Sequence, residues 1–173
     1  MIDRKIFVGT VFMLFAMFSC SEGEVFYRFH HLDRERWYKD SLLVFTMDSA
    51  VLTPGKLFDL TIELSANRGY PYRDLWLRVD HNLTDTLIKR DTLHIELADR
   101  DGKWLGSGTG GLNHLSVPYL RQILPTVRDS MAGYSVVIAH IMNDNPLRGI
   151  ERVGLIKEVA FVSEKIEDGD REE

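Results

Sequence analysis

The chain has 173 residues, of which 45% are hydrophobic and 27% are charged, with a formal net charge of −5. Without a short leader about 150 residues remain, which suits a single domain with one core. The modest negative charge and the lack of a basic patch argue against nucleic-acid binding. Because the sequence holds one cysteine, it can form neither an internal disulfide nor a cysteine metal cluster.

The N-terminus has the pattern of an export signal. Arg4 and Lys5 precede an apolar run over residues 6–18, which is too short to span a bilayer comfortably and is typical of a signal-peptide core. The run ends in "LFAMFSC", which resembles the lipobox of bacterial lipoproteins, whose cysteine is diacylated and becomes the new N-terminus after cleavage. The residues themselves also allow a buried N-terminal helix with Cys20 in the core.

The lipobox resemblance implies a lipid-anchored protein of the cell envelope. Residues 1–19 would be a cleaved lipoprotein signal peptide, and residues 20–24 would be the lipidated Cys20 and a short tether. Ser21 directly after the cysteine favours the outer membrane, by similarity to lipoprotein sorting rules. The expected connection to the membrane is the lipid alone.

Alternation of apolar and polar residues predicts strands between residues 25 and 160. It is clearest over residues 57–65, 74–80 and 92–98, and it places Leu75, Leu77 and Val79 inward with Trp76 outward. Less regular alternation predicts further strands, over residues 24–31, 41–48, 133–141 and 152–160. Seven or eight strands indicate an all-β domain, an antiparallel β-sandwich of jelly-roll-like form. Residues 116–124 could hold one short helical turn, and residues 161–173 are predicted to be an acidic disordered tail.

The glycine-rich segment "LADRDGKWLGSGTGGLNHL" (residues 97–115) is predicted to be a long loop. Asp101-Gly102 signals a tight turn, and Trp104 either plugs the end of the sandwich or presents a flat ring to a partner. Since no helix follows the glycines, the segment is not a phosphate-binding loop. Asp99 and Asp101 faintly resemble a calcium loop but lack its later ligands. We therefore expect no cofactor.

The sequence shows no catalytic motif. Its six histidines lack metal-ligand spacing with one another, and there is no nucleophile elbow or H-E-x-x-H pattern. We expect a non-enzymatic protein. A hydrolase whose two acids come from distant strands is the remaining alternative.

Three segments resemble the gliding-motility lipoprotein family GldH. They are "YPYRDLWL" (residues 70–77), "DTLHIELADRDGKWLGSGTG" (residues 91–110) and "MNDNPLRGIERVGL" (residues 142–155), and they follow a lipoprotein cysteine. The resemblance implies a non-catalytic envelope lipoprotein associated with gliding motility and the related type IX secretion machinery. Its partners would be other envelope proteins, which it would bind without catalytic residues.

Aromatic side chains offer an alternative function, binding of carbohydrate. Exposed rings stack on sugar faces, and four rings are candidates for a partner or ligand surface: Tyr70, Tyr72, Trp76 and Trp104. Coplanar exposed rings would favour carbohydrate, whereas buried rings would favour a protein partner. A third possibility is a spacer or chaperone-like factor for another lipoprotein.

Aspartate followed by Ser or Thr and then a small or apolar residue occurs five times. The pattern resembles the acceptor motif of a periplasmic O-glycosylation system, and its hydroxyls are Ser41, Ser49, Thr86, Thr92 and Ser130. Thr86 is the best candidate because its surroundings are polar. An aspartate turn that leads into a strand produces the same three letters.

Overall fold

The computed structural model describes residues 26–49, 51–52, 55–85, 87–126 and 133–160. The predicted signal peptide, Cys20, the tether and the acidic tail lie outside these ranges. Within them, no helix is long and apolar enough to cross a membrane.

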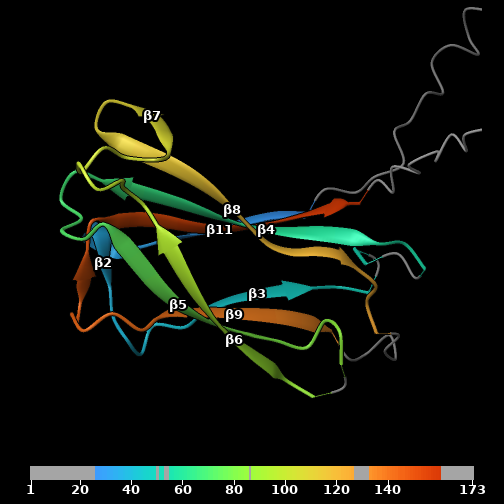
Figure 1. Ribbon diagram of the computed structural model, residues 1–173. Coiled ribbons are helices and arrows are strands. Elements are labelled where there is room, and N and C mark those ends of the chain that lie inside the picture. The colour runs from blue at the N-terminus through green and yellow to red at the C-terminus, as the bar shows by residue number, and fades with distance from the viewer. Residues whose placement is uncertain (1–25, 50, 53–54, 86, 127–132, 161–173) are drawn as a thin grey trace, which may run out of the picture.

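The described chain forms two antiparallel sheets that face each other (Figure 1). One sheet has the order β1 (Phe26–His31), β11 (Ile150–Val159), β4 (Phe58–Asn67), β8 (Leu112–Ile123) and β7 (Ser107–Thr109). The other has the order β3 (Leu43–Met47), β9 (Tyr134–His140), β5 (Asp74–His81) and β6 (Lys89–Glu96). A 3-10 turn, η2 (Asp33–Glu35), precedes a small pair made of β2 (Arg36–Trp37) and β10 (Leu147–Arg148). The predicted all-β sandwich is confirmed.

The core lies between the two sheets and follows the period of two in the sequence. Leu75, Leu77 and Val79 of β5 are fully buried, as predicted, while the outward Trp76 is 40% exposed. On β4 the inward residues Leu60, Ile62 and Leu64 are at most 1% exposed and belong to the same hydrophobic cluster. One core of apolar side chains therefore joins the sheets.

Two segments form strands where a loop or a helical turn was expected. Residues 112–123 run as β8 along β4, so the suggested helical turn near Pro118 is wrong. This segment takes an extended conformation because β4 offers it backbone hydrogen-bond partners along most of its length. Register irregularities near Leu60 accommodate Pro118, which has no N–H to donate. Part of the predicted glycine-rich loop forms a hairpin, in which β7 pairs with the start of β8.

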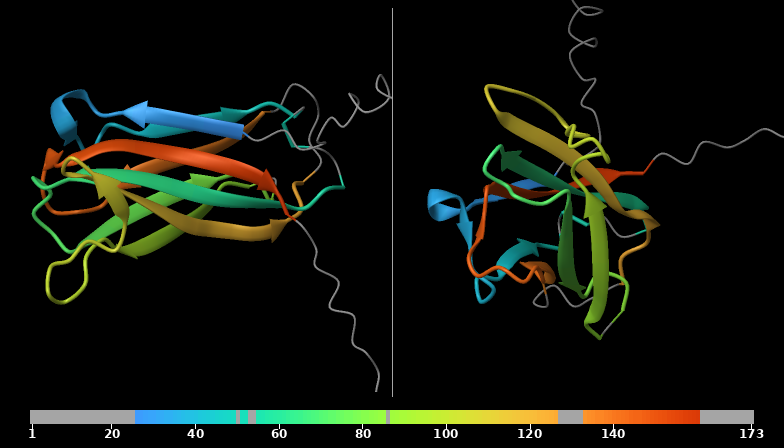
Figure 2. Two further views of the ribbon diagram at one scale, coloured as in Figure 1. Left: turned by 90° about the horizontal axis from the view of Figure 1, so that it is seen from above. Right: turned by 60° about the vertical axis from the view of Figure 1, so that its left-hand side comes forward.

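The strand directions create two different ends of the sandwich. Phe26 of β1 pairs with Lys157 of β11, so both ends of the described chain lie at the same end, which we call the terminal end (Figures 1 and 2). The described residues of the loops 48–57, 82–88 and 124–133 lie there too. The opposite end, the distal end, is made of residues 32–42, 67–73, 97–111 and 141–149.

A glycine on β11 makes room for an aromatic ring on the edge strand β1. A Cβ atom at Gly154 would lie 2.2 Å from Cε1 of Phe29, a distance that only an absent side chain allows. The guanidinium of Arg152 lies 4.6 Å from the Phe29 ring centroid, and the Tyr27 ring packs edge-on at 4.4 Å. The outer face of β1 is therefore attached to β11 by packed rings as well as by backbone hydrogen bonds.

A buried histidine lies between the sheets. The His81 side chain is 0% exposed, and its ring packs edge-on against Tyr119 of β8 at 5.9 Å. The Leu83 backbone N–H donates to Nδ1 at 3.3 Å, which assigns a neutral ring with the proton on Nε2, 3.4 Å from Oδ2 of Asp91. Burial lowers the pKa of His81 and outweighs the attraction of the Asp91 carboxylate.

Acid should therefore destabilise the fold. Because burial holds the folded-state pKa of His81 below its unfolded value of about 6.5, the unfolded chain binds protons first, and stability falls as pH drops below that value. His81→Asn keeps an acceptor for the Leu83 N–H and should lose less stability on acidification, measured by urea unfolding at a series of pH values. His140, whose pKa burial also lowers, remains in both proteins and accounts for a residual loss. Identical pH dependence in both proteins would contradict the assignment to His81.

Candidate functional site

The three segments with family resemblance, far apart in the sequence, meet at the distal end. The Gly149 N–H donates to the Glu35 carbonyl at 3.1 Å, and the Asn67 N–H donates to the Gly149 carbonyl at 2.9 Å. The Tyr70 ring in turn lies 6.3 Å from that of Trp104, centroid to centroid. Since a Cβ atom at Gly149 would lie 2.3 Å from the Tyr70 nitrogen, Tyr70, Trp104 and Gly149 bring a part of each segment together at this end.

Three of the four candidate aromatic rings gather there, but not in one plane. Tyr70 is 5% exposed and meets Tyr72 at 5.8 Å with an interplanar angle of 75°. Trp104 is half-buried and tilted by 53° to Tyr70. Rings that meet edge-on and cover one another plug the end of the sandwich, so this geometry favours the plug interpretation of Trp104.

A hydrogen bond holds Tyr70 in place, and both distal tyrosines have a raised pKa. The Tyr70 hydroxyl donates to the Asp74 carbonyl at 2.7 Å. Burial, followed by the charge of Asp74, raises the pKa of Tyr70, which therefore remains a neutral donor. A hydrogen bond to the Asp144 side chain raises the pKa of Tyr72.

The fourth ring belongs to a separate cluster on the outer face of the β3-β9-β5-β6 sheet. Trp76 of β5 pairs with His94 of β6, and the two rings stack with centroids 4.3 Å apart and an interplanar angle of 22°. Oδ2 of Asp74 accepts from Trp76 Nε1 at 3.0 Å and interacts with His94 Nε2 at 3.1 Å. One carboxylate therefore holds both rings in a fixed orientation. Trp76 therefore belongs to a different cluster from the distal rings.

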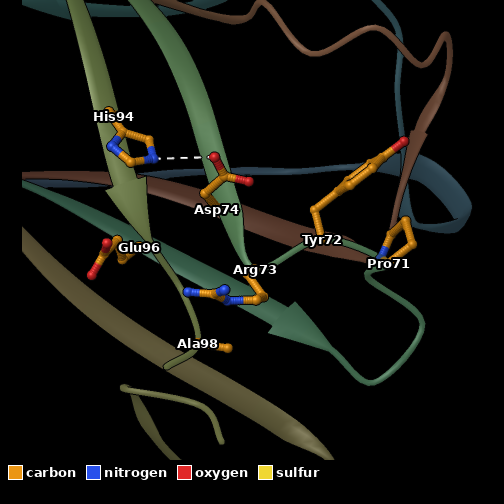
Figure 3. A pocket seen from close by; sticks show the side chains of 7 residues that line it. All are labelled: Pro71, Tyr72, Arg73, Asp74, His94, Glu96 and Ala98. Atoms are coloured by element: carbon orange, nitrogen blue, oxygen red, sulfur yellow. Dashed lines mark hydrogen bonds and ion pairs between the residues drawn. The ribbon is translucent and has the colours of Figure 1, made fainter. Parts of the chain in front are cut away.

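A hollow of about 420 Å³ lies between this cluster and the distal rings. Figure 3 shows its lining, which comes from the start of β5 and the end of β6: Pro71, Tyr72, Arg73, Asp74, His94, Glu96 and Ala98. Arg73 points across the hollow toward β6, where Glu96 stands. Charges of both signs beside partly exposed rings suit a polar partner surface that carries both a cation and an anion.

The acidic turn in the glycine-rich segment has a structural role. Oδ1 of Asp99 accepts the backbone N–H groups of Asp101 at 3.0 Å and Lys103 at 2.9 Å. The carboxylate that could have been a calcium ligand thus closes its own turn. Among the described residues, no group of three or more His, Cys, Asp or Glu side chains could hold a metal ion.

The candidate modification sites lie in different surroundings. Cys20, Thr86 and Ser130 fall outside the described residues. Ser41 is exposed in a turn at the distal end, where its N–H donates to the Tyr38 carbonyl at 3.0 Å. Thr92 is exposed on β6, and Ser49 is half-buried.

Sequence reasoning missed the charged residues of the hollow. Asp74 and His94 stand at outward positions of two predicted strands. This outward placement was the one sign in the sequence that their side chains could belong to a surface site. Their proximity depends on β5 and β6 being neighbours in a register that pairs Trp76 with His94. Arg73 and Glu96 lie within two of the family segments, but nothing in the sequence singled them out from their neighbours.

A family model and two similar proteins carry the same description, GldH lipoprotein. The family model described as GldH lipoprotein matches residues 24–156. The chain is 28% identical to the Gliding motility lipoprotein GldH homolog of Christiangramia forsetii, with 90% of this chain and 92% of that protein covered. It is 27% identical to the Gliding motility lipoprotein GldH of Flavobacterium johnsoniae, with 84% and 87% covered. A solved structure described as "nora virus structure" matches 87% of this chain and 63% of its own chain, with 13% identity and a TM-score of 0.35, too low for any inference.

Proposed function

Because the chain belongs to the GldH lipoprotein family, we propose that it is a lipid-anchored, non-catalytic envelope protein of the gliding motility machinery. Through that machinery it would act with the type IX secretion apparatus, by binding other envelope proteins. The observation that carries the proposal is the convergence of the family segments on the distal end, beside the charged hollow. That end is the proposed partner surface.

The proposed anchor and the proposed partner surface lie at opposite ends of the domain. Cys20 is the proposed lipidation site, and each buried methylene of an acyl chain contributes about 0.8 kcal/mol to membrane binding, so several chains hold the protein stably. Six peptide units separate Cys20 from Phe26, at the terminal end. The distal end therefore faces away from the membrane, toward partners. Ser21 supports the outer membrane as the location.

Mass spectrometry of the protein purified from its own envelope tests the anchor and the glycosylation motifs together. The expected mature protein begins at Cys20 with lipid on its sulfur and its amino group. We also propose a glycan on at least one acceptor hydroxyl, with the exposed Ser41 and Thr92 the most accessible described sites. An uncleaved chain with a free thiol would refute the anchor. A mass equal to polypeptide plus lipid would refute glycosylation alone.

Charge reversal in the hollow should abolish partner capture without unfolding the protein. Arg73→Glu places a third acid beside Asp74 and Glu96, so it should repel an anionic group of the partner. The expected results are loss of crosslinked motility proteins from the native envelope and loss of cell spreading, with an unchanged urea midpoint. The measurement is crosslinking, capture and identification by mass spectrometry.

Arg28→Glu is the matched control for this experiment. Arg28 is also an exposed arginine, but it lies on β1, the edge strand of the other sheet. This variant should retain both capture and spreading. Equal loss in the two variants would indicate a general charge effect, and wild-type capture by Arg73→Glu would exclude the hollow as the partner surface.

A further inference from the structure

The three most exposed large apolar side chains of the described residues lie at the terminal end. Leu87 is 74% exposed, Ile88 is 73% exposed and Leu124 is 56% exposed. Leu87 and Ile88 directly precede β6, and Leu124 directly follows β8. Large aliphatic side chains at such exposure leave most of their apolar surface in water in the isolated domain.

Leu124 and the pair Leu87-Ile88 lie on two segments that touch. The Thr126 N–H donates to the Leu83 carbonyl at 2.9 Å, and the Tyr134 hydroxyl donates to the Thr126 carbonyl at 2.5 Å. The first bond attaches the chain after β8 to the loop between β5 and β6, and the second attaches it to the start of β9. Leu87, Ile88 and Leu124 therefore belong to neighbouring segments of the terminal end, and we call these three side chains the apolar rim.

The chain that precedes β1 limits how far the start of β1, at the terminal end, can be from a bilayer. From Cys20 to Phe26 the chain can extend about 20 Å at most, whatever conformation it takes. Because β1 begins at the terminal end, this end is held close to the lipid surface. We propose that Leu87, Ile88 and Leu124 insert into the membrane interface, so that the domain rests on the bilayer instead of standing free of it.

Contact through apolar side chains is favoured over a purely electrostatic one. Charged residues at this end have both signs, with Lys56 and Lys89 opposed by Asp48 and Asp85. Attraction of a basic patch to anionic headgroups would weaken with salt, whereas burial of apolar surface would not. The membrane contact should therefore persist at high ionic strength.

The proposal rests on the lipid anchor of the proposed function, and the test separates the two. The full chain is expressed in a host that processes lipoproteins, and the lipid on Cys20 is verified by mass. Since Cys20 is the single cysteine and is then blocked, Ile88→Cys provides one free thiol for an environment-sensitive fluorophore. The labelled protein is reconstituted in phosphatidylethanolamine and phosphatidylglycerol vesicles. Leu105→Cys, an exposed aliphatic position at the distal end, is the matched control.

The label at position 88 should shift to the blue and lose emission to lipids with brominated acyl chains, in low and high salt, while the label at 105 does neither. A label at 88 that behaves as in water, on a verified lipoprotein, would overturn the rim contact and leave the anchor intact. A blue shift without quenching by brominated lipid would instead indicate protein contact, from a second copy or another partner, and would also overturn it. Without lipid on Cys20, both proposals fail.

Discussion

Gly149→Ala should destabilise the protein by about 3 kcal/mol or more. Gly149 has φ of +84°, a left-handed conformation that costs a residue with a side chain about 1–2 kcal/mol. A Cβ atom would also lie 2.3 Å from the Tyr70 nitrogen and 2.5 Å from its Cα. Because both atoms belong to the backbone, no side-chain rotation relieves the overlap. The hydrogen bonds that join Gly149 to Glu35 and Asn67 would be strained together.

Gly102→Ala separates the two contributions. Gly102 has nearly the same conformation, with φ of +81°, but nothing lies within 4 Å of its added Cβ. It should lose only the conformational part, about 1–2 kcal/mol, in urea unfolding followed by circular dichroism. If both variants lost the same stability, close packing of the distal end against Gly149 would be disproved.

Trp37→Ala should cost about 3–5 kcal/mol, the range for removing a large buried aromatic side chain. Trp37 is 0% exposed, and its indole N–H donates to the Ser41 carbonyl at 2.9 Å. Its ring also lies 5.3 Å from that of His140, whose Nε2 bonds to the Trp37 carbonyl at 3.0 Å. The substitution leaves a cavity in the core, and the Ser41 carbonyl loses its indole donor.

Trp76→Ala is the matched control for tryptophan removal. Trp76 is 40% exposed and stacks on His94 at the surface, so its loss should cost less than about 1 kcal/mol. Denaturant midpoints of the two variants provide the comparison. A Trp37 variant as stable as the Trp76 variant would contradict the buried position of Trp37.

The proposed partner surface predicts different behaviour for these variants and for Arg73→Glu. Gly149 packs against the Tyr70 backbone and Trp37 is buried at the distal end, so both stabilise the partner surface. Their variants should therefore lose partner capture together with stability. Arg73 is exposed and lines the hollow, so its variant should lose capture alone. The combination of both measurements distinguishes a damaged support from a damaged contact.

The sequence alone determined the class of fold and the family. Alternation over residues 57–65 and 74–80 predicts strands with one buried face, and β4 and β5 follow it with Leu60 and Leu77 inside and Trp76 outside. The period of two is a local property, set by which side chains leave water, so it can be read without neighbours. The family resemblance of three segments is confirmed by the match over residues 24–156.

Only the tertiary structure decided which strands are neighbours and which residues meet. The hollow exists because β5 pairs with β6 in the register that stacks Trp76 on His94, and the suggested turn near Pro118 became a strand because β4 provides its partners. The closeness of Gly149 to Tyr70 depends on chain segments almost 80 residues apart. Such contacts arise when two whole sheets pack together, and the free energy of that packing is distributed over many residues. The sequence pattern shows only which individual residues are buried, and so it cannot show which of them touch.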